Sequence, residues 1–206
     1  SAALVLLTTR NGRKMEASAN KDGLLTMLDR EKVSQQAKNP DQDLAFIYAV
    51  PITVRENADI TLSREVFTHF KPGILGGAQW NGPAYYPELD LIYTGTVDWG
   101  AKIKLPPLED ARKNVPETGE IWFGGELQFD DPAEARGWIQ AHHVPTGALK
   151  WKLQTSGPAW PAVTVTAGGV LFCGSAYGDV YALDAETGSI LWQHNTGVLN
   201  GGGIVT

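Results

Sequence analysis

The strongest constraint on the fold of this chain is an internal repeat. The segment from Gly178 to Gly197 reads GDVYALDAETGSILWQHNTG, and a weaker copy, GWIQAHHVPTGALKWKLQTSG, begins 41 residues earlier at Gly137. Glycine, alanine, Thr-Gly and tryptophan recur at equivalent positions of the two copies: Gly137 and Gly178, Ala141 and Ala182, Thr146-Gly147 and Thr187-Gly188, Trp151 and Trp192. A repeat of this length is typical of the four-stranded blades of a β-propeller.

The repeat unit has the pattern of two strands joined by a tight turn. Asp184 to Gly188 forms the turn, in which Gly188 is suited to a positive φ and Asp184 to accepting hydrogen bonds from the turn's own backbone. The indoles of Trp151 and Trp192 are large enough to cover the joint between neighbouring sheets. We therefore expect both tryptophans to be packing residues rather than ligand-binding residues.

A third, partial copy lies near the start of the chain. The spacing from Gly23 to Asp29 equals that from Gly178 to Asp184, but Val33 stands where the turn glycine is expected and Ala37 where the tryptophan is expected. We expect this blade to close through some other contact.

The composition agrees with an all-β chain and excludes some partners. The chain has 23 Gly, 12 Pro and 43% hydrophobic residues, without an apolar run long enough for a transmembrane segment. The net charge is −6 and the 17 basic residues are scattered, which argues against nucleic acid as a partner. The single Cys173 lies in an apolar strand and reads as a buried, inert thiol.

These observations predict one partial propeller over residues 1–206, with about four blades of four-stranded antiparallel sheets. Two long irregular excursions, 32–72 and 104–133, interrupt it, and a short helix is expected at Leu62–Phe67. Loops of such length in a compact domain usually carry function or form interfaces. His142 and His143 are adjacent in an expected strand, so they point to opposite faces and are not read as a metal pair.

Three motifs resemble a known family. They are GGAQWNGPAYYP from Gly76 with LIY at 91–93, NKDG from Asn20 with LDR at 28–30, and TVTAGGVLFCG from Thr164. Together they resemble the C-terminal half of a pyrroloquinoline quinone (PQQ)-dependent alcohol dehydrogenase, a quinoprotein built as an eight-bladed propeller with tryptophan-docking repeats. The resemblance runs from about residue 3 to residue 206.

The resemblance implies a set of cofactor-binding residues. A Lys or Arg in the segment that matches NKDG reaches the quinone oxygens in that family, which points to Lys21; such a cation polarises a carbonyl and stabilises the anion formed on hydride arrival. The other reading of Lys21 is a solvent-facing turn residue.

Two further segments match cofactor-binding parts of the family. Gln79 occupies the position of a cofactor-binding Asn, while Trp80 either walls the pocket or packs beneath Gly76 and Gly77. Leu199 and Asn200 belong to a segment that resembles the one closing over the quinone edge, although three following glycines also suit a flexible strand entrance.

The same resemblance implies that essential parts lie outside this chain. The catalytic Asp base, the calcium ligands, the Trp that stacks on the quinone and an adjacent disulfide belong to segments preceding Ser1. We therefore expect a fragment of about half a propeller, with no catalytic or metal-binding residues of its own and without activity alone. Its two open faces are expected to promote self-association.

Two functions are consistent with these motifs. In the first, the parent protein oxidises a small alcohol by hydride transfer to PQQ, passes electrons to a cytochrome and resides in the periplasm. In the second, the chain is a non-catalytic scaffold, because similar repeats also build outer-membrane assembly factors. Scaffolds do not require Lys21 or the Gly76–Trp80 segment, so the first function is favoured.

Overall fold

The computed structural model describes residues 4–39, 41, 45–113, 117–120 and 124–203, and these form four antiparallel sheets. Three sheets have four strands each, and we call them blades 1, 2 and 3. Blade 1 contains β1 (Leu4–Thr8), β2 (Lys14–Ala19), β3 (Leu24–Asp29) and β4 (Phe46–Pro51). Blade 2 contains β6 (Ala84–Tyr86), β7 (Leu91–Asp98), β10 (Arg136–His143) and β11 (Leu149–Thr155). Blade 3 contains β12 (Thr164–Val165), β13 (Val170–Gly174), β14 (Asp179–Asp184) and β15 (Ile190–Asn195).

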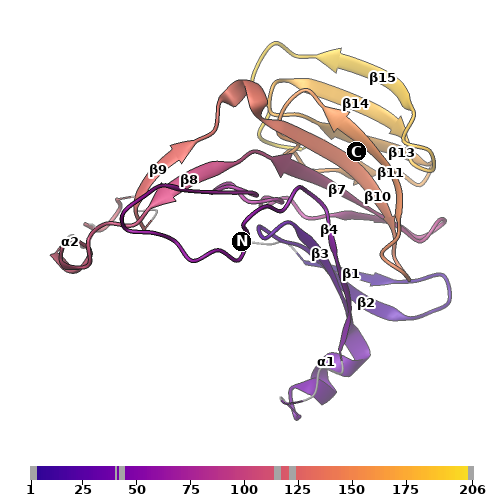
Figure 1. The fold of residues 1–206 in the computed structure, drawn as a ribbon. Helices are drawn as coiled ribbons and strands as arrows, with labels where there is room; N and C mark the ends of the chain where they lie inside the picture. Colours follow the sequence, from indigo (N-terminus) through magenta and orange to yellow (C-terminus); the bar gives the residue numbers. More distant parts are fainter. Residues whose placement is uncertain (1–3, 40, 42–44, 114–116, 121–123, 204–206) are drawn as a thin grey trace.

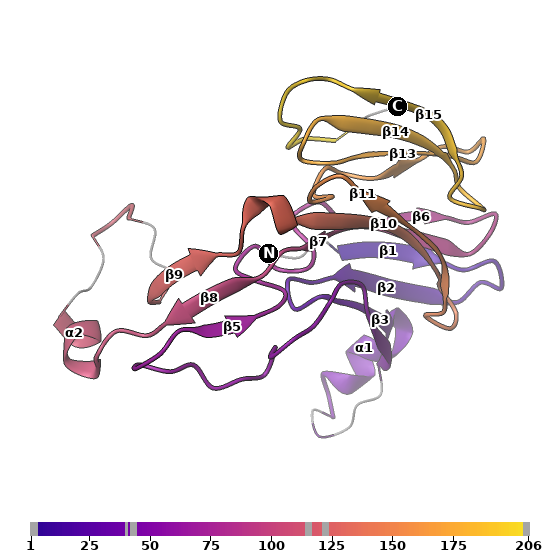
Figure 2. The same ribbon diagram turned by 45° about the horizontal axis from the view of Figure 1, so that its top comes forward.

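The three blades lie side by side, with blade 2 between the other two (Figure 2). Their first strands converge, because β6 contacts both β1 and β12. Each blade then adds its strands outward from this inner edge, so that β4, β11 and β15 are outermost. The all-β, partial-propeller fold expected from the repeat is confirmed. Where about four four-stranded blades were expected, the described residues form three, and the fourth sheet has three strands.

All three blades share one irregularity of register. The pairing of the third strand with the fourth shifts after Met27 in blade 1, after Ala141 in blade 2 and after Ala182 in blade 3. These three residues stand four positions after Gly23, Gly137 and Gly178, so the weak N-terminal copy is a true repeat. A bulge kept at one position bends each blade in the same way.

The joint between blades 2 and 3 is built around Trp151. Its Nε1 donates to the carbonyl oxygen of Ala185 at 3.1 Å, and a Cβ on Gly188 would lie 2.6 Å from its ring. Only a glycine, here with φ 75°, leaves room for the indole. The packing role expected for Trp151 is confirmed.

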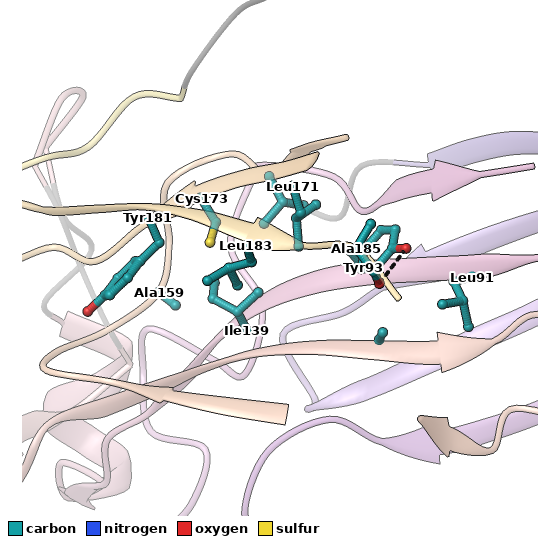
Figure 3. Close-up of a cluster of buried hydrophobic side chains, with 11 residues drawn as sticks. Leu91, Tyr93, Ile139, Ala159, Leu171, Cys173, Tyr181, Leu183 and Ala185 are labelled. Carbon is teal, nitrogen blue, oxygen red and sulfur yellow. Dashed lines mark hydrogen bonds between the residues drawn. The ribbon is translucent and has the colours of Figure 1, made fainter. Parts of the chain in front are cut away.

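A buried apolar cluster fills the same joint (Figure 3). It includes Tyr93, whose hydroxyl donates to the carbonyl oxygen of Ala185 at 3.0 Å, and Cys173, whose thiol pKa is raised by burial. The cysteine is therefore the buried residue that the sequence predicted.

Tyr48 takes the place of the missing tryptophan at the joint between blades 1 and 2. It pairs with Met27 as Trp151 pairs with Ala141. Its hydroxyl donates to the carbonyl oxygen of Val144 at 2.8 Å, and its ring lies 2.9 Å from where a Cβ on Gly147 would stand. The contact of Tyr48 with Val144 and Gly147 is therefore the alternative contact that was expected to close the blade of the partial N-terminal copy.

The excursion expected at 32–72 is more regular than its sequence indicates. Helix α1 (Arg30–Gln36) replaces the tight turn, with Asp29 as its N-cap, and β4 completes blade 1 inside this range. The helix predicted at Leu62–Phe67 is wrong: residues 64–66 form a bend and the others have no regular structure, while Ser63 Oγ accepts from the backbone of Glu65 and Val66. A serine side chain thus satisfies the local backbone without a helix.

The fourth sheet lies to one side of the blades and has three strands. It consists of β5 (Thr68–Phe70), β8 (Ala101–Lys104) and β9 (Glu126–Phe129), in the order β5-β8-β9, and we call it the side sheet. Helix α2 (Leu108–Lys113) follows β8, and the 3₁₀ helix η1 (Pro132–Glu134) precedes β10 (Figure 1). Residues 40, 42–44, 114–116 and 121–123 of the two expected excursions lie outside the described residues.

Candidate functional site

One end of the blades gathers every segment that the sequence singled out for cofactor binding. In an antiparallel four-stranded blade, the turn between strands two and three lies at the same end as the connection to the next blade. The Lys21 turn, the Gly76–Trp80 segment before β6 and the 196–203 segment after β15 therefore share one end, which we call the site end. The long connection containing the side sheet lies there too.

Lys21 and the Gly76-Gly77 pair are in direct contact. The backbone N–H of Gly77 donates to the carbonyl oxygen of Lys21 at 2.8 Å, and that of Ala78 donates to Asn20 at 3.2 Å. A Cβ on Gly76 would lie 2.6 Å from that of Lys21, and one on Gly77 would lie 2.5 Å from the Cα of Gly23. The two motifs need these glycines because their backbones touch.

Gln79 and Trp80 face different surroundings. Gln79 is 3% exposed and its Nε2 donates to the carbonyl oxygen of Leu75, so its amide nitrogen braces its own loop. Trp80 is 56% exposed, and the atoms nearest to where Cβ atoms on Gly76 and Gly77 would stand belong to Lys21, Gly23 and Thr53. More than half of the Trp80 surface is therefore open at the site end.

Trp160, a tryptophan outside the three sequence motifs, connects the residue after the Gly76–Trp80 segment with the 196–203 segment. The carbonyl oxygen of Trp160 accepts from Asn81 Nδ2 at 2.5 Å, and its indole Nε1 donates to the carbonyl oxygen of Asn200 at 3.0 Å. Asn200 also donates its N–H to Ala176 at 3.1 Å, while Leu199 is exposed. Trp160 stands outside the repeat, in GPAWPA, and a tryptophan between prolines was the available signal.

Lys21 differs from Arg55 and Lys71, two other cations at the site end, in that its side chain has no partner among the residues that the structure describes. Arg55 donates Nε to the carbonyl oxygen of Asp22 at 3.0 Å, and Lys71 pairs with Asp98 at 3.4 Å. None of the ion pairs among the described residues involves Lys21. Its ammonium is left available at the surface.

No metal centre is formed within the part of the chain that the structure describes. It contains no group of three or more His, Cys, Asp or Glu side chains able to hold an ion. His142 and His143 do lie on opposite faces of β10: His142 is buried in a cleft between blades 1 and 2, and His143 contacts Thr146 Oγ1 at 3.0 Å. Burial lowers the pKa of His142 to about 4.

Similar curated proteins are quinoprotein alcohol dehydrogenases. The quinoprotein alcohol dehydrogenase PedE of Pseudomonas putida is 26% identical over 208 residues, which covers 91% of this chain and 31% of that protein. The 1-butanol dehydrogenase (quinone) of Thauera butanivorans is 24% identical over 91% of this chain and 33% of its own length. This chain thus spans about a third of the length of the curated relatives it matches.

Solved structures show the same fold. A europium-containing methanol dehydrogenase aligns with 98% of this chain and 36% of its own, with a TM-score of 0.75 and 20% identity. The quinohemoprotein alcohol dehydrogenase from Comamonas testosteroni aligns with 98% of this chain and 31% of its own, with a TM-score of 0.71 and 19% identity.

A family model described as outer membrane protein assembly factor BamB matches residues 135–201, which are the two regular repeats. The matches to the quinoproteins extend over both the repeats and the N-terminal blade, so the resemblance read from the three motifs is confirmed: the chain is a homologue of quinoprotein alcohol dehydrogenases. Among the described residues no helix is long and apolar enough to span a membrane.

Proposed function

We propose that this chain, a homologue of quinoprotein alcohol dehydrogenases, forms one side of a PQQ site in a protein that oxidises a small alcohol. The observation that supports this most is the contact between the Lys21 turn and the Gly76–Trp80 segment. These two motifs are 55 residues apart in the sequence; one lies in the β2–β3 turn of blade 1 and the other in the connection that leads into blade 2. Their assembly at one end, with an uncommitted ammonium, is what an anionic, planar ligand requires.

The residues at the site end fit the quinone in part. Lys21 supplies a cation for a quinone oxygen, and Trp80 supplies an open aromatic surface. Asn200 is held by Trp160 and Ala176, so its segment is fixed against the β13–β14 turn and the connection between blades 2 and 3. Gln79 uses one N–H of its amide on the carbonyl oxygen of Leu75, which leaves its amide oxygen and one N–H for a ligand. When bound, the quinone would accept the hydride; Lys21 would stabilise negative charge on its oxygen.

The described residues do not fit a calcium site. Because these residues contain no cluster of acidic ligands, no step of the reaction is assigned to a metal that they would hold. We propose that the base and metal ligands belong to the rest of the protein, and that this chain alone turns over no alcohol. Transfer of electrons to a cytochrome is proposed for the whole protein, since one relative is named methanol dehydrogenase [cytochrome c] subunit 1. A periplasmic location is proposed from the resemblance to bacterial quinoprotein dehydrogenases alone.

A scaffold without catalysis is the second candidate. The match of residues 135–201 to the BamB family model favours it, because that match needs only the repeats. The Lys21 turn and the Gly76–Trp80 segment lie outside the matched residues. A scaffold gives no reason for their close contact.

Titration of the purified chain with PQQ separates the two functions. Quenching of tryptophan fluorescence and the quinone absorbance would follow binding in the wild type, in Lys21→Ala and in the control Lys150→Ala. Lys150 is also exposed, but it lies on β11 next to the turn at the opposite end. We expect Lys21→Ala to weaken binding about tenfold or more, as loss of a charged hydrogen bond does, and Lys150→Ala to leave it unchanged. Equal binding by both variants, or none by the wild type, would favour the scaffold.

A further inference from the structure

A buried aspartate links three segments at the site end. Asp179, the first residue of β14, is 6% exposed. Its Oδ2 accepts from Ser156 Oγ and, at 3.2 Å, from Ser175 Oγ, while its Oδ1 accepts from Asn195 Nδ2 at 2.9 Å. Ser156 follows the last strand of blade 2, Ser175 begins the turn between β13 and β14, and Asn195 ends β15.

The carboxylate is held in its charged form. Burial alone would raise the pKa of Asp179, but the hydrogen bonds donated by Ser156, Asn195 and Ser175 outweigh it, so the pKa lies below its usual value. Hydrogen bonds to a charged acceptor are about twice as strong as neutral ones. The three donors are therefore bound firmly to one another through this group.

The segment after Asn195, residues 196–203, is what this network controls, and we call it the closing loop. Asn195 Oδ1 accepts from the N–H of Gly197 at 2.8 Å, so the amide side chain that Asp179 fixes also fixes the first turn of the loop. Thr196 N–H donates to Gly178 at 2.9 Å and Asn200 N–H donates to Ala176 at 3.1 Å. Both acceptors belong to the turn that lies between Ser175 and Asp179.

We propose that Asp179 is a positioning residue for the cofactor site: it fixes the closing loop, and through it Asn200, against the β13–β14 turn and Trp160. This inference rests on the function proposed above. Asp179 does not itself contact the ligand. It sets the position of the closing-loop backbone relative to Trp160, whose indole donates to Asn200.

The test compares Asp179→Asn with Asp29→Asn in the full chain. Asp29 is also buried, also has a lowered pKa, and pairs with Arg13 at 2.9 Å, but it caps α1 at the opposite end. It therefore controls for the general cost of neutralising a buried carboxylate. PQQ affinity, the absorbance of the bound quinone and hydrogen exchange at the Thr196 and Asn200 amides are measured in both, with Asp179→Glu as the rescue variant.

We expect Asp179→Asn to bind PQQ about tenfold more weakly, as loss of charge-assisted hydrogen bonds predicts, and to exchange both amides faster. Asp29→Asn should bind as the wild type does, and Asp179→Glu should recover part of the affinity. Unchanged exchange in Asp179→Asn, or equal loss of affinity in Asp29→Asn, overturns the inference. A wild-type chain that binds no quinone contradicts the proposed function instead; faster exchange then still identifies Asp179 as the residue that positions the loop.

Discussion

Two tryptophans at equivalent positions of the repeat have different surroundings. Trp151 lies in the joint between blades 2 and 3, and Trp192 lies on the outer face of blade 3. Trp151 pairs with Ala141 as Trp192 pairs with Ala182, and both stand on the outermost strand of their blade. Trp151 is docked on Gly188, whereas Trp192 is 52% exposed beside His194. The difference shows that the docking geometry comes from the neighbouring blade and is not a property of the repeat that contributes the ring.

The largest effect is expected for Trp151→Ala. It removes a docked indole and its hydrogen bond to Ala185, and we expect the free energy of unfolding to fall by about 3 kcal/mol. Urea denaturation followed by circular dichroism measures this. A loss no larger than that of Trp192→Ala would show that docking contributes nothing to stability.

The joint between blades 1 and 2 differs in being partly polar, and this predicts a pH dependence. His142 is 2% exposed, and burial lowers its pKa to about 4 from a usual value near 6.5. The unfolded chain therefore binds the proton more readily, so stability is complete above pH 6.5 and falls toward pH 4, by on the order of 3 kcal/mol. His142→Gln should remove this dependence, as measured by urea denaturation from pH 4 to 7. Lys152 is the other basic side chain that lines this cleft. Equal slopes for the two proteins would contradict the assignment.

A smaller effect is expected where tyrosine replaces tryptophan. Tyr48→Phe keeps the ring on Gly147 but removes the donor to Val144, which should cost about 1 kcal/mol. Thermal unfolding of this variant, beside Tyr86→Phe as a control for an exposed hydroxyl, measures the cost. If the two substitutions cost the same, the hydrogen bond is not part of the joint.

The smallest effect on stability, within about 0.5 kcal/mol, is expected for Trp192→Ala. Its effect on association should be larger. Ile190, Leu191 and Trp192 are exposed on β15, and Leu4 and Leu6 are exposed on β1, so we propose that the chain self-associates through these faces. Light scattering at high concentration should show a mass above that of the monomer in the wild type and a reduced mass in Trp192→Ala. A wild type that stays monomeric would refute the proposal.

The sequence predicted the repeating part of the fold because each element there is encoded locally. Gly188 has the expected positive φ, and Asp184 accepts from the N–H groups of Glu186 and Thr187 as its turn position indicates. Blade 1 was only partly recognised because α1 separates Asp29 from β4, which moves the aromatic residue from the position of Ala37 to Tyr48.

The remaining elements depend on partners that are distant in the sequence. The three short strands of the side sheet pair β5 with β8 and β8 with β9 across long connections, and strands of three or four residues carry too little periodicity to be recognised. At the site end, the sequence selected Lys21 and Trp80 from motifs. Trp160 and Asp179 were missed because their roles follow from hydrogen bonds between blades.

The presence of Tyr48 at the tryptophan position of blade 1 affects how propeller blades are recognised in a sequence. A search that requires tryptophan would find two blades in this chain, although three are present. What recurs is on the blade that accepts the ring: a glycine with positive φ and, three residues before it, a carbonyl oxygen that accepts the hydrogen bond from the incoming ring. Val144 with Gly147 and Ala185 with Gly188 are the two examples. Either a tyrosine or a tryptophan ring can fill the joint, whereas the glycine and the carbonyl of the accepting blade are the same in both joints. The blades of a divergent propeller are therefore better recognised by this glycine and its turn than by the tryptophan.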